Sequence, residues 1–156
     1  MDARPKARSR GTQRSDRSLE GSIGSQLILA MNLIMRPFLD EHAKRLDLTL
    51  PEWRALKSLA AEPGRSGEEI ARSLYTDRMT VSRALRRLEG NGRAERRKDP
   101  TDRKKNLWSL SKAGWAVFNE LSPLATARQA EVLSSLTNEE RETLHRALGK
   151  IIEDIG

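Results

Sequence analysis

The sequence predicts a mainly helical fold with a small β-sheet, in the α+β class. Apolar residues recur at spacings of three and four over most of the chain, which is the period of helices with one buried face. Serine or threonine followed three residues later by glutamate marks helix starts at positions 49, 66 and 137. Two short runs, 94–98 and 106–110, carry strand-type residues around a polar loop, which indicates a hairpin.

The chain of 156 residues fits one compact domain behind a tail. Residues 1–20 are polar and basic without periodicity, and we interpret them as a disordered tail. In residues 21–156, a lobe at about 49–110 lies between helical segments at about 22–47 and 111–155. Apolar residues from Ile23 to Phe38 predict the first helix, which Pro37 should kink. Pro123 should kink the helix that restarts at Ser111.

The lobe is predicted to contain a helix over 50–62, a short helix from Ser66, a tight break at 75–76 and a helix that begins after Asp77. Val81, Leu85 and Leu88 form the inward face of the last helix, which ends at the Gly90–Gly92 stop signal. Two helices joined so closely pack at a steep angle and present the second helix outward.

Positive charge is concentrated in this lobe. Residues 65–105 carry 13 Lys and Arg against 7 Asp and Glu, which is most of the formal net charge of +7. Focused positive charge is typical of a protein that binds a polyanion. An outward helix of this kind enters the major groove of DNA with its N-terminal residues on base edges. The predicted contacts on this helix and the preceding turn are Thr76, Arg78, Met79, Thr80, Ser82, Arg83, Arg86 and Arg87.

The loop of the hairpin carries consecutive cations that suit an adjacent minor groove or its phosphates. We expect Asp99 and Asp102 to brace this loop through hydrogen bonds instead of contacting DNA. Arg93, which follows the helix stop, either contacts a phosphate or is solvated. The predicted DNA contacts of the hairpin are Arg96, Arg103, Lys104 and Lys105.

Residues 24–155 resemble the MarR family of bacterial winged helix-turn-helix transcription regulators. The resemblance is carried by the run Asp77–Glu89, by Gly92, by the acidic-basic loop 99–104 and by the Leu-Ser-Lys-Ala-Gly restart at 110–114. Many family members have arginine at the position of Lys104, and lysine lacks the planar fork that suits deep groove insertion.

The resemblance implies a homodimer that binds a pseudo-palindromic operator in double-stranded DNA. The terminal helices also carry more apolar surface than one lobe can cover, although a monomeric core would use the same residues. The predicted dimer contacts are Ile23, Leu27, Met31, Leu144, Leu148, Ile151, Ile152 and Ile155.

The family often senses small anionic aromatic compounds, so the resemblance implies a repressor that such a ligand releases. The candidate pocket consists of Met35, Phe38, His42 and Trp53, with Arg54 or Arg36 as partner of a carboxylate. Each of these residues also has a plain structural interpretation, as a core, dimer or packing contact, or as a surface or capping histidine.

Other functional classes find little support in the sequence. No cysteine, no His pair at ligand spacing, no glycine-rich phosphate loop and no nucleophile–base pair occur in it, so we expect no metal, no cofactor and no enzyme. The absence of a long apolar run or leader predicts a cytoplasmic protein without membrane contact. Two alternatives stay open, a nonspecific architectural DNA-binding protein and an adaptor that binds an acidic protein through the same basic surface.

Overall fold

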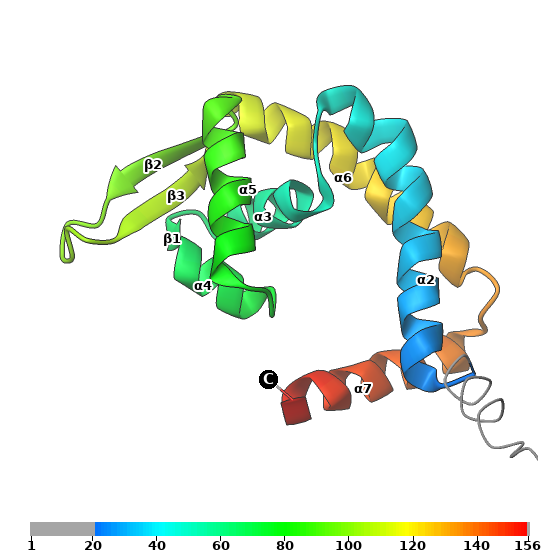
Figure 1. Ribbon diagram of the computed structural model, residues 1–156. Coiled ribbons are helices and arrows are strands. Elements are labelled where there is room, and N and C mark those ends of the chain that lie inside the picture. Colours follow the sequence, from blue (N-terminus) through cyan, green and yellow to red (C-terminus); the bar gives the residue numbers. More distant parts are fainter. Residues whose placement is uncertain (1–20, 156) are drawn as a thin grey trace, which may run out of the picture. The chain divides into compact units, whose positions relative to one another are not determined.

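The structure is a computed structural model, and it describes residues 21–155 (Figure 1). The predicted tail, residues 1–20, lies outside the described residues. Helices dominate, with one small sheet, as the sequence predicts. In chain order the elements are α2 (Ile23–Phe38), a π-helical turn (Leu39–Ala43), a 3-10 turn (Lys44–Leu46), α3 (Leu50–Ala61), β1 (Arg65–Ser66), α4 (Gly67–Ser73), α5 (Arg78–Gly90), β2 (Ala94–Lys98), β3 (Asn106–Leu110), α6 (Lys112–Leu133) and α7 (Asn138–Ile155).

The described residues divide after Arg36 into two compact units. The first contains most of α2, whose apolar side chains Ile23, Leu27 and Met31 are exposed. Pro37 lies inside α2, and the α-helix gives way two residues later to the π-helical turn. Proline removes one N–H from the helical ladder, and the predicted disturbance therefore takes the form of a change in helix type after Pro37.

Local hydrogen bonds start α3, α4 and α7 as the sequence predicts. The Glu52 carboxylate accepts from the Thr49 N–H at 3.2 Å, which closes the capping box of α3. In α4, the Ser66 N–H donates to Glu69 at 2.7 Å and the Glu69 N–H donates to the Ser66 hydroxyl at 3.2 Å. Thr137 pairs with the fourth residue of its box in the same way. Each box satisfies backbone donors that a helix start leaves unpaired.

The sheet has the strand order β1-β3-β2 and is antiparallel. The predicted hairpin is confirmed at both strands, with Ala94 opposite Leu110 and Lys98 opposite Asn106. β1 was not predicted from the sequence, because a two-residue strand carries no periodicity. The N–H of Gly64, at a φ of +83° that favours glycine, donates to the carbonyl of Trp108 at 2.8 Å and leads the chain into β1.

The core of the second unit lies among α3, α4, α5 and α6. The predicted inward face of α5 is confirmed, because Val81, Leu85 and Leu88 are buried. α6 continues through Pro123 as one helix. α7 contains no buried residue. None of the described helices has the length and apolar character needed to cross a membrane. The other large side chains that are almost fully buried include Trp53, Leu56, Leu59, Ile70 and Leu121.

Candidate nucleic-acid interface

The turn between α4 and α5 is tight and is built from backbone hydrogen bonds. Tyr75 has a φ of +46°, and its N–H donates to the carbonyl of Arg72 at 3.2 Å. The next N–H, of Thr76, donates to the carbonyl of Ala71 at 3.0 Å. This pair of bonds is a Schellman motif, in which the left-handed residue is usually glycine. It ends α4 and turns the chain directly into the start of α5.

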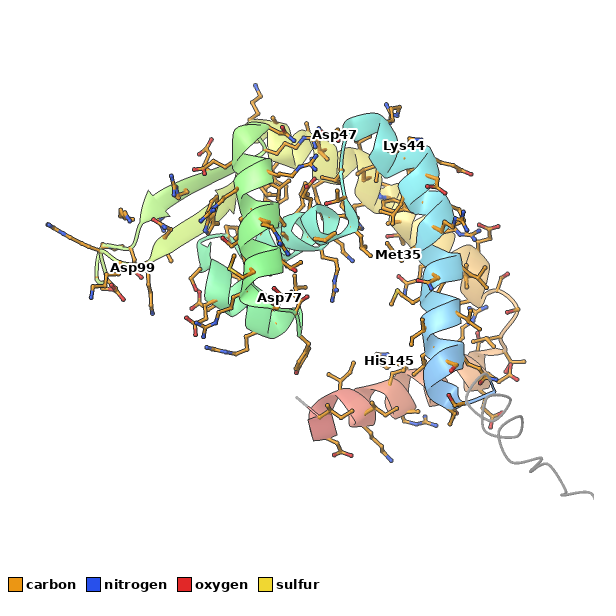
Figure 2. The ribbon with its side chains drawn as sticks, viewed as in Figure 1. Met35, Lys44, Asp47, Asp77, Asp99 and His145 are labelled. Carbon is orange, nitrogen blue, oxygen red and sulfur yellow. The ribbon has the colours of Figure 1, made fainter. Side chains whose placement is uncertain are left out.

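Asp77 caps α5. Its carboxylate accepts from the N–H of Thr80 at 2.8 Å, and the hydrogen bonds that Thr80 supplies, the side-chain one first, hold the pKa of Asp77 below its usual value. Figure 2 shows Asp77 at the N-terminal end of α5 and Asp99 at the tip of the β2–β3 hairpin. The two ends that the sequence predicts to reach DNA are thus on the same lobe.

α5 separates its side chains cleanly between core and solvent. Leu85 and its apolar neighbours are buried, whereas Arg78, Met79, Arg83 and Arg86 are exposed and Thr80 and Ser82 are half-buried. Met79 is 64% exposed, although it is a large apolar residue. An exposed methionine between arginines on a helix that projects from its lobe suits contact with base edges and methyl groups.

The exposed arginines make contacts that DNA could replace. Arg78 forms an ion pair with Glu68 at 2.6 Å, and Arg96 forms one with Glu89 at 3.0 Å. The guanidinium of Arg96 also lies 5.9 Å from the centre of the Trp108 ring. Exposed ion pairs of this kind contribute little to stability. They hold the side chains in place without binding them so tightly that a phosphate could not compete.

A hollow of about 290 Å³ lies between α5 and the hairpin, and it was not foreseen from the sequence. Cations from three elements line it, with Arg78 and Arg86 from α5, Arg96 from β2 and Lys105 from the loop. Serines 66 and 82 and Asn106 add polar groups. Only the fold brings these residues together, and they extend the positive surface from the helix to the hairpin.

The acids of the hairpin loop brace it, as predicted. Asp99 accepts from the N–H and the hydroxyl of Thr101 at 2.8 and 2.7 Å, and Asp102 accepts from the N–H of Lys104 at 2.9 Å. The hydrogen bonds from Thr101, the side-chain one first, lower the pKa of Asp99. The loop therefore presents exposed cations on an ordered backbone, and these are Arg103, Lys104 and Lys105.

Two arginines lie differently from the sequence-based expectation. Arg93 is half-buried and donates to the carbonyl of Leu46 at 2.5 Å, so its side chain is bound within the protein. Arg87, which we predicted as a DNA contact, forms ion pairs with Glu52 at 2.9 Å and with Asp47 at 3.0 Å. The sequence showed that Arg87 flanks the outer stripe of its helix, but the partners come from a distant segment that periodicity cannot identify.

The candidate effector residues are only partly brought together. The ring of Phe38 lies 5.9 Å from that of His42 and 5.4 Å from that of Trp53. Trp53 is 1% exposed and stacks on Phe118, so it packs in the core. Arg54 donates to the carbonyl of Leu74 and lines a separate small hollow next to α5. Met35 and Arg36 belong to the first unit.

Comparison with known proteins agrees with this geometry. The family model "MarR family" matches residues 48–105, which contain α3 to α5 and the hairpin as far as its loop. A curated HTH-type transcriptional repressor of Mycobacterium tuberculosis is 28% identical over 128 residues, which cover 82% of this chain and 92% of that protein.

Two solved structures have the same fold. A mutant of Escherichia coli MarR complexed with operator DNA is 26% identical, covers 83% of this chain and 92% of its own, and has a TM-score of 0.74. BpsR of Bordetella bronchiseptica, whose DNA binding is regulated by 6-hydroxynicotinic acid, is 23% identical, covers 85% and 94%, and has a TM-score of 0.76. The outward α5 lies within the residues that match the MarR family, and the chain is similar to DNA-binding transcription regulators of that family.

Proposed function

We propose that this protein is a sequence-specific repressor that binds a pseudo-palindromic operator as a homodimer. The observation that carries the proposal is the outward row of α5, where Met79 and Arg83 are exposed at the N-terminal half of a helix that Asp77 caps. Helices of this kind read base edges in the major groove with their first turns. A nonspecific binder needs cations, but it does not need such short polar and apolar side chains between them.

The residues divide into two roles. Arg78, Met79, Thr80, Ser82 and Arg83 read bases, because they occupy the first turns of α5. The remaining predicted contacts, except Arg87, which is paired with Glu52 and Asp47, hold the phosphates on either side of the groove and set the register of the lobe on the duplex. These are Thr76, Arg86, Arg96, Arg103, Lys104 and Lys105, of which Arg86, Arg96 and Lys105 share the hollow between helix and hairpin.

The homodimer is supported by apolar surface in each unit. α7 exposes Leu144, Ile151, Ile152 and Ile155 and buries nothing in the single chain. In the first unit, Ile23 and Met31 are exposed to more than half. Contiguous exposed apolar surface of this kind is typical of an interface. The dimer thus uses helices on both sides of the lobe at about 49–110.

The repressor is released by a small aromatic or anionic ligand. The support is chemical, since the Phe38, His42 and Trp53 rings form an aromatic group near the start of the lobe. The fold is also that of BpsR, which is regulated by 6-hydroxynicotinic acid. Release of the bound operator by 6-hydroxynicotinic acid and other aromatic carboxylates, measured by fluorescence anisotropy, tests this part separately.

The test of operator binding is a selection from random duplex DNA, followed by titration of the winner and of a scrambled duplex at two salt concentrations. A two-fold symmetric winner that binds at least 100-fold more tightly than the scrambled duplex supports the proposal. Equal and salt-sensitive binding to both duplexes contradicts it. That result would support the architectural alternative, which the 13 cations of residues 65–105 favour.

A further inference from the structure

One acidic residue of the lobe is buried and bound to the helix that reads DNA. Glu52 is 1% exposed and lies in the first turn of α3. One carboxylate oxygen accepts from the N–H of Thr49 at 3.2 Å, and the other pairs with Nε of Arg87 at 2.9 Å. A carboxylate out of water is costly unless it is paired and hydrogen-bonded. The pair with Arg87 is therefore a requirement of the fold at this position.

The same guanidinium makes a second contact. Nη2 of Arg87 lies 3.0 Å from a carboxylate oxygen of Asp47, a residue at a φ of +47° that ends the 3-10 turn. Immediately after α5, Arg93 donates to the carbonyl of Leu46. Two arginines thus bind the C-terminal end of α5 to the segment 46–52. We call these contacts of Arg87 and Arg93 the α5 anchor.

We propose that Arg87 is a positioning residue for operator recognition, which acts through Glu52 and Asp47 to fix the direction of α5 and not by holding a phosphate. Base reading demands placement to within about 0.5 Å and 10–20°. Met79 lies eight residues from Arg87, about 12 Å along the helix. A tilt of about 10° at the anchored end would therefore move the base-reading turns by roughly 2 Å, which is enough to lose bidentate contacts.

Arg86 provides the matched comparison, because it is the neighbouring arginine of α5, is exposed, lines the hollow beside the hairpin and forms no ion pair within residues 21–155. A phosphate contact contributes about one unit to the slope of log affinity against log salt, whereas a positioning residue contributes none. The inference rests on the proposed operator binding for its effect on affinity, but the salt slope can be measured on any duplex.

The experiment measures affinities of purified full-length variants for the selected operator and for a scrambled duplex at four or more salt concentrations. We expect Arg87→Met to lower the affinity for the operator at least about 10-fold and the affinity for the scrambled duplex less than about 3-fold. The slope of log affinity against log salt should not change. Arg86→Met should lower the slope by about one on both duplexes. Arg87→Lys should not restore operator affinity, because a lysine keeps the charge but lacks the fork that joins two carboxylates.

Neutralising Glu52 and Asp47 separates positioning from simple electrostatics, because the two predict opposite changes in DNA affinity. Glu52→Gln and Asp47→Asn make the protein more positive, so simple electrostatics predicts tighter DNA binding. Positioning predicts weaker operator binding in both variants. The Asp47 side chain is 81% exposed, so Asp47→Asn should stay folded even if Arg87→Met or Glu52→Gln unfolds. Thermal unfolding of each variant checks this.

The inference is overturned if Arg87→Met lowers the slope as Arg86→Met does, or if Asp47→Asn binds the operator as tightly as the unmodified protein or more tightly. If the unmodified protein binds the operator and the scrambled duplex with equal affinity, that result contradicts the proposed function as a sequence-specific repressor. In that case the slopes of the two arginine variants still decide whether Arg87 holds a phosphate.

Discussion

At the residue scale, Arg83 and Lys104 should separate base reading from phosphate binding. Arg83 projects from the second turn of α5, and Lys104 lies on the hairpin loop with its N–H held by Asp102. We expect Arg83→Ala to weaken operator binding by about 1–3 kcal/mol and to relax sequence preference. Lys104→Ala should weaken binding to all duplexes similarly and reduce the salt slope by about one. Equal losses for Arg83→Ala on operator and scrambled duplex would contradict its assignment.

Tyr75 adopts a left-handed backbone conformation that is unfavourable for residues other than glycine. It has a φ of +46° at the end of α4 and is 66% exposed, so little packing compensates for the backbone strain. Tyr75→Gly should therefore stabilise the fold by about 0.5–1 kcal/mol, measured as a rise in the denaturant midpoint. Ser73→Gly, at the last residue of the same helix, should instead destabilise the fold. A fall in stability for Tyr75→Gly would mean that the tyrosine ring makes a contact that matters.

Gly114 has no room for a side chain. A Cβ on this residue would lie 1.9 Å from the carbonyl oxygen of Arg93, a backbone atom that accepts a hydrogen bond from the N–H of Ser111 at 3.1 Å. Gly114→Ala should therefore destabilise the fold by at least about 1–3 kcal/mol in thermal unfolding. Gly90→Ala is the control, because a Cβ there meets nothing within 4 Å and alanine is the better helix former. Equal stability of the two variants would show that the start of α6 can move away from Arg93.

At the scale of elements, local signals explain what could be predicted from sequence. The starts of α3, α4 and α7 were predicted because each capping box lies within four residues. The bracing of the hairpin loop by Asp99 was predictable for the same reason. β1 could not be predicted, because its two residues form a strand only through pairing with the distant Trp108 and Leu107.

The partners of arginines show the same limit. Charge and helical period placed Arg87 at the edge of the outward face of α5, but Glu52 and Asp47 lie before β1 and α4 in the chain. The cation-lined hollow beside the hairpin joins residues from α5, β2 and the loop for the same reason. The sequence predicts which element carries a charged side chain. The ion-pair partner of that side chain depends on how the elements pack.

The hairpin loop should depend on pH through Asp99. Its hydrogen bonds from Thr101 lower the pKa in the folded state, so the ionised carboxylate is the form that the fold favours. The ordering of the loop should be fully present above the ordinary aspartate pKa of about 3.9 and should be lost as pH falls through the lowered folded value. Hydrogen-exchange protection of the Thr101 and Asp102 amides, corrected for intrinsic rates, measures this.

Asp99→Ala is the control for this prediction. It should reduce the protection of the two amides at neutral pH and leave little further change on acidification. The Asp102 carboxylate faces the same loop through the N–H of Lys104, so Asp102→Ala should disturb that amide and leave the protection of Thr101 largely intact. Unchanged protection of Thr101 in Asp99→Ala would contradict the bracing role.

At the scale of the molecule, the distribution of apolar surface requires a partner for the terminal helices. In the second unit, side chains of α3 to α6 fill the core, whereas α7 exposes Ile151, Ile152 and Ile155 and buries none of its residues. A second copy of the chain satisfies this surface and at the same time supplies the second α5 that a two-fold operator needs.

Ile151→Glu should therefore convert the dimer into a monomer in sedimentation velocity experiments, because a carboxylate in an apolar interface is not solvated. The helix keeps its local capping box at Thr137, so circular dichroism should change little if α7 remains helical. Lys150→Glu introduces the same side chain at an exposed neighbouring position and should leave the dimer intact.

Loss of the dimer should also reduce operator affinity far more than affinity for a half-site, because the two lobes no longer bind as one unit. A sedimentation mass that Ile151→Glu leaves unchanged would remove α7 from the interface. Two exposed apolar residues of α2, Ile23 and Met31, would then be the ones to substitute, since they also lie outside the lobe. Operator affinity that falls without a change in mass would instead show that α7 acts on DNA binding within one chain.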